Sequence, residues 1–136
     1  IYAIKHSIDN KTPLINFCSG GGMRMMASAV SLTKGMAATT IAINELKKNK
    51  LPYIVCVADP CAGGISASYA MTGDIIMGEV GALCAFAGRR VVQATVKEEL
   101  PDDFQSVEFL QKHVLLLQAA SLSAFTHVSS IILMKI

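Results

Sequence analysis

Apolar residues along the chain fall either in short unbroken runs or at helical spacing, and Gly, Pro or Asn separates most of these segments. A short run rich in β-branched residues is typical of a strand covered on both faces, whereas apolar residues three and four apart are typical of a helix. Strands are expected at residues 14–18, 51–58, 74–77 and 82–87. Helices are expected at residues 1–8, 23–32, 36–48, 64–71, 91–99 and 104–113, with Gly35 between the second and the third and Asp59-Pro60 ending the strand before the fourth. This alternation over short connections predicts an α/β fold with a mainly parallel sheet.

The last part of the chain, residues 114–136, has a different pattern, since it contains no acidic residue and a single basic one, Lys135. Its length reaches the range that spans a bilayer, but Ser, Thr, Gln and His residues dilute its apolar character. We therefore expect an apolar C-terminal helical segment that is buried or faces a partner, and a membrane span is disfavoured.

Composition narrows the class of protein. A chain of 136 residues fits one domain with a substantial core. Hydrophobic residues make up 52% of it and charged residues 16%, which is lean in charge for a free-standing domain, so surface buried against a partner is expected. The formal charge of +2 creates no field that would favour nucleic acid or an anionic membrane.

The four cysteines, Cys18, Cys56, Cys61 and Cys84, form no C-x-x-C pair and join no histidine at metal-binding spacing, so no metal site is predicted. Three of them lie in apolar runs and Cys61 lies at a turn, which favours buried or half-buried thiols over disulfides. Free thiols are typical of a reducing compartment, and no secretory signal opens the chain, so an intracellular protein is expected.

Two Gly-Gly pairs, Gly21-Gly22 and Gly63-Gly64, carry the strongest chemical signal, because each stands where a strand-like run gives way to a helix-like one. Glycine lets the backbone approach a ligand closely, and the first N–H groups of the following helix have no intrahelical acceptor. If the two strands lie side by side, the two turns can converge on one carbonyl oxygen and stabilise it as it becomes an enolate. For the first pair alone, a plain tight turn is the alternative interpretation.

Other chemistries fit the residues less well. The segment GISAS at 64–68 resembles a G-x-S-x-G nucleophile turn, but the final glycine is missing and the three histidines, at positions 6, 113 and 127, are scattered. Ser66 and Ser68 are therefore interpreted as small residues that permit close packing. The glycine-rich segment 19–24 matches neither the phosphate-binding P-loop nor the dinucleotide-binding pattern.

One long run makes a family resemblance specific. Residues 59–71 read DPCAGGISASYAM, followed by Gly73, Asp74 and Ile75, and this run resembles the signature of the carboxyltransferase β subunit of multisubunit acetyl-CoA carboxylase. Further matching segments are 21–22, 24–25, 51–53, 86–88, 90–91, 100–101, 104–105, 108–110 and His113. The resemblance covers about residues 1–113, which are assigned to a carboxyltransferase core, with 114–136 left as a segment of uncertain role.

The resemblance implies a crotonase-like (ClpP/crotonase) α/β fold of repeated ββα units, of which the N-terminal part has no counterpart in this chain. It implies an enzyme that moves a carboxyl group from carboxybiotin, on a biotin carboxyl carrier protein, to acetyl-CoA to form malonyl-CoA for fatty-acid synthesis. The family's subunit works with a carboxyltransferase α subunit in a hetero-oligomer, in the bacterial cytoplasm or the plastid stroma, and binds no cofactor covalently. The family's zinc ribbon is not represented in this sequence.

Site residues follow from the matching positions. Gly21, Gly22, Gly63 and Gly64 are expected to be backbone donors to the oxyanion. Candidate substrate contacts are Arg24, Ala62, Ser66, Gly88 and Arg90. For Arg24, a structural ion pair beneath the first turn is the alternative to a contact with CoA or biotin.

Several positions depart from the family pattern. Met26 and Ala27 replace polar residues, and Val114 and Leu117 replace a Gly and an Asp, so the turn after His113 is expected to be lost and the helix to continue. These departures motivate an alternative, a non-catalytic or degenerate assembly subunit that retains the crotonase-like fold. A third hypothesis, another acyl-CoA enzyme such as a hydratase, would need a glutamate near the second glycine turn, where the nearest is Glu79.

Overall fold

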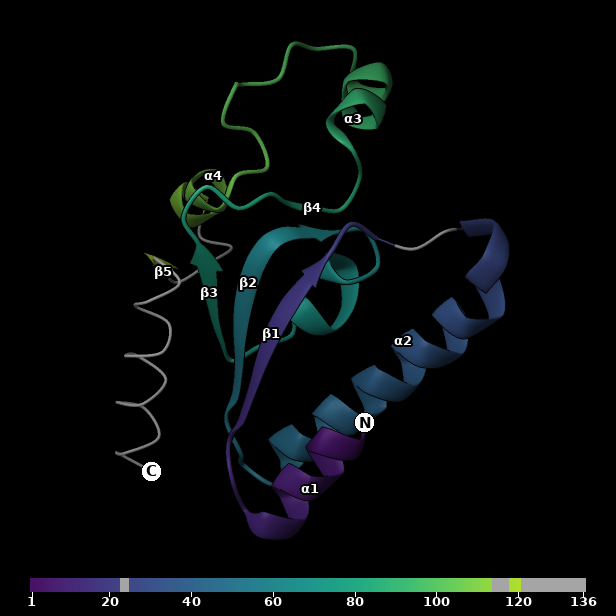
Figure 1. Cartoon of the computed structure of the whole chain (residues 1–136), viewed down its shortest axis with the longest axis vertical. Coiled ribbons are helices and arrows are strands. Elements are labelled where there is room, and N and C mark those ends of the chain that lie inside the picture. Colours follow the sequence, from purple (N-terminus) through teal and green to yellow (C-terminus); the bar gives the residue numbers. More distant parts are fainter. Residues whose placement is uncertain (23–24, 114–117, 121–136) are drawn as a thin grey trace.

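The computed structural model describes residues 1–22, 25–113 and 118–120 (Figure 1). The elements in chain order are α1 (Tyr2–Asn10), β1 (Leu14–Gly20), α2 (Met25–Lys48), β2 (Tyr53–Ala62), η1 (Ser66–Ala70), β3 (Ile75–Glu79), β4 (Cys84–Ala85), α3 (Arg89–Val96), α4 (Val107–Lys112) and β5 (Gln118–Ala120). Strands thus alternate with helices over most of the described chain, as the sequence pattern predicts.

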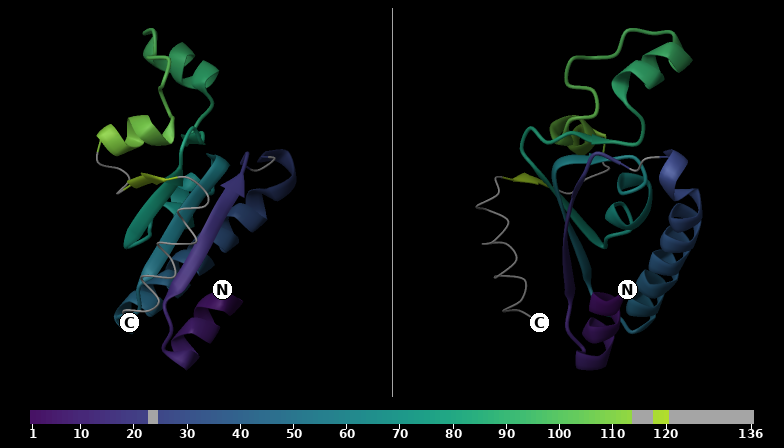
Figure 2. Two further views of the ribbon diagram at one scale, coloured as in Figure 1. Left: turned by 60° about the vertical axis from the view of Figure 1, so that its left-hand side comes forward. Right: turned by 45° about the vertical axis from the view of Figure 1, so that its right-hand side comes forward.

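The described strands form one sheet in the order β1-β2-β3-β5, and β4 pairs with the last residues of β2. Every strand pair within it is parallel, which confirms the predicted parallel sheet. Figures 1 and 2 show α1, α2 and η1 together on one side of the sheet, and α3 and α4 beyond the carboxyl ends of its strands. The turns that follow β1 and β2 therefore lie at one edge.

The core is built around β2, whose residues from Tyr53 to Val57 are all buried. Tyr53, Val55 and Val57 pack in one cluster with Ile43 and Leu46 of α2. The alternate residues Ile54 and Cys56 pack with Met77 in a second cluster. Because successive side chains of a strand point to opposite faces, this strand is covered on both sides, as its unbroken apolar run predicts.

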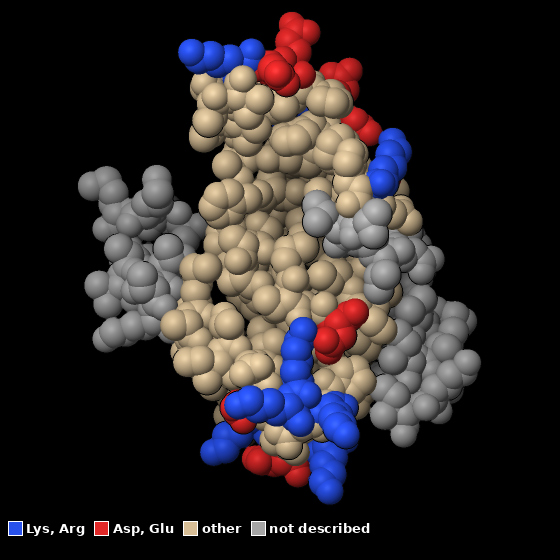
Figure 3. Space-filling view, turned by 180° about the vertical axis from the view of Figure 1, so that it is seen from behind, with Lys and Arg blue, Asp and Glu red and all other residues tan. Residues whose placement is uncertain are grey.

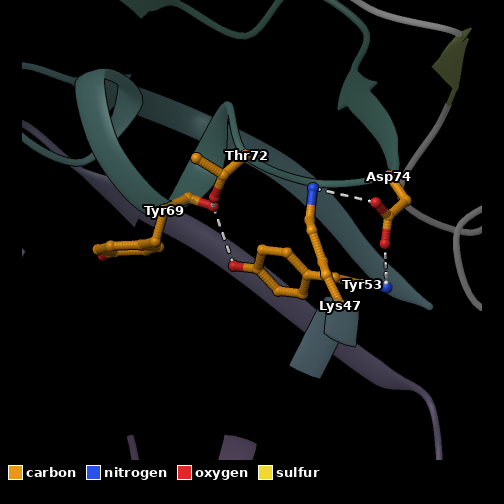
Figure 4. Close-up of polar contacts among 5 residues, drawn as sticks. All are labelled: Lys47, Tyr53, Tyr69, Thr72 and Asp74. Atoms are coloured by element: carbon orange, nitrogen blue, oxygen red, sulfur yellow. Dashed lines mark hydrogen bonds and ion pairs between the residues drawn. The ribbon is translucent and has the colours of Figure 1, made fainter. Parts of the chain in front are cut away.

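A polar network fixes the amino ends of β2 and β3 (Figure 4). The Tyr53 hydroxyl donates to the Tyr69 carbonyl at 3.0 Å, and the Tyr53 N–H donates to the Asp74 carboxylate at 2.9 Å. Lys47 pairs with the other oxygen of Asp74 at 3.0 Å. Burial raises the pKa of Tyr53 to about 12, so this hydroxyl stays a proton donor at any physiological pH. The network joins α2, η1 and β3 to the start of the central strand.

Two predicted boundaries are wrong because tertiary contacts outweigh local signals. The helices expected at 23–32 and 36–48 form one helix, α2, since Gly35 in a helix interior costs only about 1 kcal/mol relative to alanine. The strand expected to end at Asp59-Pro60 continues to Ala62. Its register against β1 shifts between the pairs Cys18–Val57 and Gly20–Cys61, and its last residues find a new partner in β4.

The shorter elements span fewer residues than the sequence predicts. The helix expected at 64–71 is a single wide turn, η1, and the strand expected at 82–87 is reduced to the two residues of β4. The helix expected at 91–99 spans Arg89–Val96 and ends where Lys97 takes a left-handed conformation. The helix expected at 104–113 begins at Val107, because the Ser106 hydroxyl caps the Phe109 N–H at 3.0 Å.

The expected continuation of the last helix past His113 is also wrong, because α4 ends at Lys112 with His113 as its C-cap. Of residues 114–136, the structure describes 118–120, which form the strand β5 beside β3 where a helix is expected. The rest of this segment lies outside the described residues, and the division of the chain at residue 113 stays a prediction. Within the described ranges, no helix is long and apolar enough to cross a membrane.

Candidate active site

The two glycine turns touch each other backbone to backbone. Gly22 has a φ of 97° and Gly63 a φ of 66°, both in the left-handed region that glycine adopts freely. A Cβ atom at Gly63 would lie 3.2 Å from the Gly22 Cα, and one at Gly22 would lie 3.7 Å from the Gly63 Cα. The two turns therefore come together as expected, and a side chain at Gly63 would need a small displacement of the first turn.

The strand order explains this convergence. β1 and β2 are parallel neighbours, with Gly20 opposite Cys61, so the turns after them leave the same edge of the sheet. The Ser19 hydroxyl donates to the Asp59 carbonyl at 3.2 Å and adds a cross-link just before the turns. The carboxyl edge of a parallel sheet is where open α/β sheets bind their ligands.

The second turn is held by β4. The Gly63 N–H donates to the Ala85 carbonyl at 3.0 Å, and the buried Ser66 hydroxyl lies 2.6 Å from the same oxygen. Both groups are thus engaged in fixing the turn. Among the described residues, no acceptor is found for the Gly64 N–H.

The other predicted site residues are spread over the same end of the molecule. Gly21 is exposed, and no described atom lies within 4 Å of where its Cβ would be. Ala62 is half-buried at the end of β2, just before the turn. Gly88 precedes α3 and Arg90 lies on it, both exposed. Arg24 lies outside the described residues.

Two contributors to the site were missed by sequence reasoning. Ala85 acts through its carbonyl oxygen, which no residue pattern marks, since the role depends on which strand pairs with the end of β2. Gln105 is part of the family-like run, but the sequence assigns it no role. In the structure it is buried and bonded to the chain on both sides of Ala85.

Three buried thiols lie beneath the turns. Cys61 and Cys84 are opposite each other in the β2–β4 pairing, and Cys18 shares their core cluster. All four cysteines are free and buried, which confirms the predicted thiols. Burial, with smaller contributions from Cys61 and Cys56, raises the pKa of Cys18 to about 12. A hydrogen bond with Cys61, and then burial, raises the pKa of Cys84. No cluster of metal-ligating side chains is found in the part of the chain that the structure describes.

We expect these thiols to resist alkylation in the folded protein. At pH 8 a thiol with a pKa near 12 is about a thousandfold less ionised than one with a pKa near 9, and the thiolate is the reactive form. Iodoacetamide labelling of the full-length protein, read at each site by peptide mass spectrometry, should be slow at Cys18 and fast after unfolding in urea. Equal rates in the folded and unfolded protein would contradict this assignment of buried thiols.

A cavity of about 300 Å³ lies between α1, α2 and the amino ends of β1 and β2, away from the glycine turns. The polar groups that line it include Asn16, Thr39 and Tyr53, and their side chains already bond within the protein. This cavity is therefore not part of the candidate site at the glycine turns.

Comparison with known proteins agrees with this geometry. Residues 1–106 match the model of the carboxyl transferase domain. The acetyl-coenzyme A carboxylase carboxyl transferase subunit beta of Pelagibacter ubique is 61% identical over 112 residues, which cover 82% of this chain and 36% of that protein. The Caulobacter vibrioides subunit is 51% identical over 81% of this chain and 36% of its own length. The chain thus spans about a third of the length of these curated relatives.

Solved structures give the same fold. A crystal structure of transcarboxylase 12S superposes with a TM-score of 0.67 at 27% identity, over 79% of this chain and 21% of that one. The Pseudomonas malonate decarboxylase MdcD-MdcE heterodimer gives a TM-score of 0.68 at 19% identity, over 88% and 54% of the two chains. The expected crotonase-like α/β fold and the resemblance to the β subunit are confirmed. From the family model over residues 1–106 and these relatives, we conclude that the chain belongs to the carboxyl transferase domain family.

Proposed function

We propose that the full protein containing this chain is a carboxyltransferase β subunit, which moves a carboxyl group from carboxybiotin to acetyl-CoA and forms malonyl-CoA. The observation that carries this proposal is the contact between the Gly22 and Gly63 turns at the carboxyl edge of the sheet, where the Gly64 N–H has no acceptor among the described residues. Similarity to named β subunits supports it.

The chemistry needs stabilisation of negative charge more than it needs titrating side chains. The bond between the carboxyl carbon and the biotin nitrogen breaks first and releases carbon dioxide. The freed biotin nitrogen then takes a proton from the methyl carbon of acetyl-CoA, and the resulting enolate carbon bonds to the carbon dioxide. In between, charge rests on the thioester oxygen, and we assign its stabilisation to the backbone of Gly64 and of the Gly21-Gly22 turn.

The remaining site residues shape the pocket in this proposal. Ala62 and Ser66 keep the wall beside the second turn small, and the Ser66 hydroxyl bonds to main-chain oxygens. Gly88 and Arg90 contact the CoA or biotin substrate, and so does Arg24. Gly63 holds the turn through Ala85, which leaves Gly64 as its principal donor.

The proposed partners are a carboxyltransferase α subunit and a biotin carboxyl carrier protein, in a hetero-oligomer in the bacterial cytoplasm or the plastid stroma. A relative from Natranaerobius thermophilus, described as carboxyl transferase subunits beta/alpha, is 50% identical over 82% of this chain and 18% of its own length. Figure 3 shows charged side chains mainly at the two ends of one face of the molecule, with a broad uncharged area between them. A face of this kind suits burial against another subunit.

Two alternatives are less well supported. The hydratase hypothesis needs a free carboxylate, yet the Glu79 side chain accepts the Asp59 N–H at 3.1 Å. A degenerate assembly subunit would retain the fold without need for the contact between the two glycine turns.

The decisive test is turnover by the full-length subunit mixed with its α partner. Malonyl-CoA decarboxylation in the presence of free biotin should exceed that of the α subunit alone, since it runs the carboxyl transfer in reverse. Turnover no higher than that of the partner alone would reject the catalytic proposal and favour the assembly subunit.

A further inference from the structure

Gln105 bonds to the segment around β4, next to the isolated antiparallel bridge between Leu83 and Ser106. It lies in the loop before α4, and 8% of its surface is exposed. Its side-chain amide donates to the Ala87 carbonyl at 2.7 Å, and its own carbonyl accepts the Cys84 N–H at 2.9 Å. Gln105 thus forms hydrogen bonds to the residues on both sides of Ala85.

The segment 84–87, to which Gln105 bonds, also forms hydrogen bonds to the second glycine turn. The Ala85 carbonyl accepts the Gly63 N–H at 3.0 Å and lies 2.6 Å from the Ser66 hydroxyl. β4 has only two residues and pairs with β2 alone among the described strands, so its own ladder fixes it weakly. The position of the Ala85 oxygen, and with it the direction of the Gly64 N–H, therefore depends on supports outside the sheet.

The backbone of Gln105 has an unfavourable conformation. Its φ is 70°, in the left-handed region, which is unfavourable for a residue other than glycine. Its buried amide would cost more if it were not hydrogen-bonded. Strained residues of this kind persist where the surrounding structure over-determines them, which is common beside ligand sites.

We propose that Gln105 is a positioning residue for carboxyl transfer: it touches no substrate, but it sets the Ala85 carbonyl that aims the Gly63-Gly64 turn. This inference rests on the proposed function, and it adds a side chain whose loss changes the rate of the chemical step more than the binding of substrate.

The test uses the full-length subunit with its α partner and the variants Gln105→Glu and Gln105→Gly. Burial raises the pKa of the new carboxyl group, so the comparison is made at pH 9, where the glutamate is ionised and cannot donate to Ala87. There kcat should fall about tenfold to a hundredfold while KM for malonyl-CoA stays within about twofold. As pH falls and the carboxyl group becomes protonated, it can donate again, and the Gln105→Glu variant should regain activity relative to the unmodified enzyme.

The glycine variant separates position from stability. Gln105→Gly removes the side-chain donor but relieves the left-handed backbone, so kcat should still fall while the thermal midpoint changes little. Gln111→Glu makes the same chemical change at an exposed position of α4 and should leave kcat unchanged. A Gln105→Gly enzyme with the kcat of the unmodified protein would overturn the inference.

Amide hydrogen exchange gives a readout that does not depend on turnover. In Gln105→Glu, exchange in a peptide covering residues 61–66 should accelerate, while exchange in β1 stays constant. Unchanged exchange there would also overturn the inference. If the unmodified complex shows no carboxyl transfer, the proposed function fails, whereas the exchange rates still decide whether Gln105 holds the turn.

Discussion

Gly63→Ala is expected to lower carboxyl transfer by about a hundredfold or more. The left-handed backbone at Gly63 disfavours any side chain by about 1–2 kcal/mol. In addition, the new Cβ would lie 3.2 Å from the Cα of Gly22, a backbone atom that cannot swing aside. The two turns must separate by a few tenths of an ångström and the Gly63-Gly64 backbone must turn, which misaligns the Gly64 N–H in the proposed site. Loss of one such donor to an oxyanion costs about a hundredfold or more in rate. Steady-state kinetics of malonyl-CoA decarboxylation by the full complex measure the effect.

Gly81→Ala is the matched control for this substitution. Gly81 has a φ of 80°, so alanine meets the same backbone strain, but no described atom lies within 4 Å of its Cβ position. We expect the free energy of unfolding to fall by about 1 kcal/mol with little change in kcat. If both variants lost activity equally, backbone strain alone would account for the loss and the contact between the turns would have no special role.

Gly78→Ala is expected to cause the largest loss of stability, about 3 kcal/mol. A Cβ at this position of β3 would lie 2.5 Å and 2.6 Å from the two methyl carbons of Val107. Val107 is fully buried, and its branched side chain has little rotational freedom in the first turn of α4. Urea unfolding of the full-length protein measures the change in the free energy of unfolding.

The double variant Gly78→Ala/Val107→Ala tests whether that contact is the cause, because removing the valine methyl groups should recover part of the loss. Gly35→Ala is the comparison without a steric conflict, since no described atom lies within 4 Å of its Cβ position, and it should stabilise the protein by about 1 kcal/mol because alanine favours a helix interior. Additive effects in the double variant would show that the destabilisation has another origin.

The central strand and the two glycine turns could be predicted from the sequence. The apolar run of β2 identified a central strand buried on both faces, and the two Gly-Gly pairs identified turns that come together. Both follow from properties of single segments, namely an unbroken run of β-branched residues and the conformational freedom of glycine. The family-like motif then connected these turns to a fold.

The features that escaped prediction all depend on partners distant in the sequence. Neither Gly35 nor Pro60 ends its element, because packing and a new strand neighbour outweigh their local preferences. The sequence predicts that the Gly63 N–H is a donor to a ligand, but in the structure this N–H donates to the Ala85 carbonyl of β4. Every residue has a main-chain carbonyl, so residue type does not indicate which of these groups acts as an acceptor at the site.

The register shift in β2 makes the number of residues between Val57 and Cys61 important for the site. Between the two matched pairs, Cys18–Val57 and Gly20–Cys61, the chain advances two positions in β1 and four in β2. This excess works as a spacer that decides where the second turn stands relative to the first. Loss or gain of one residue in this spacer would shift the second glycine turn along β2 and separate it from the first.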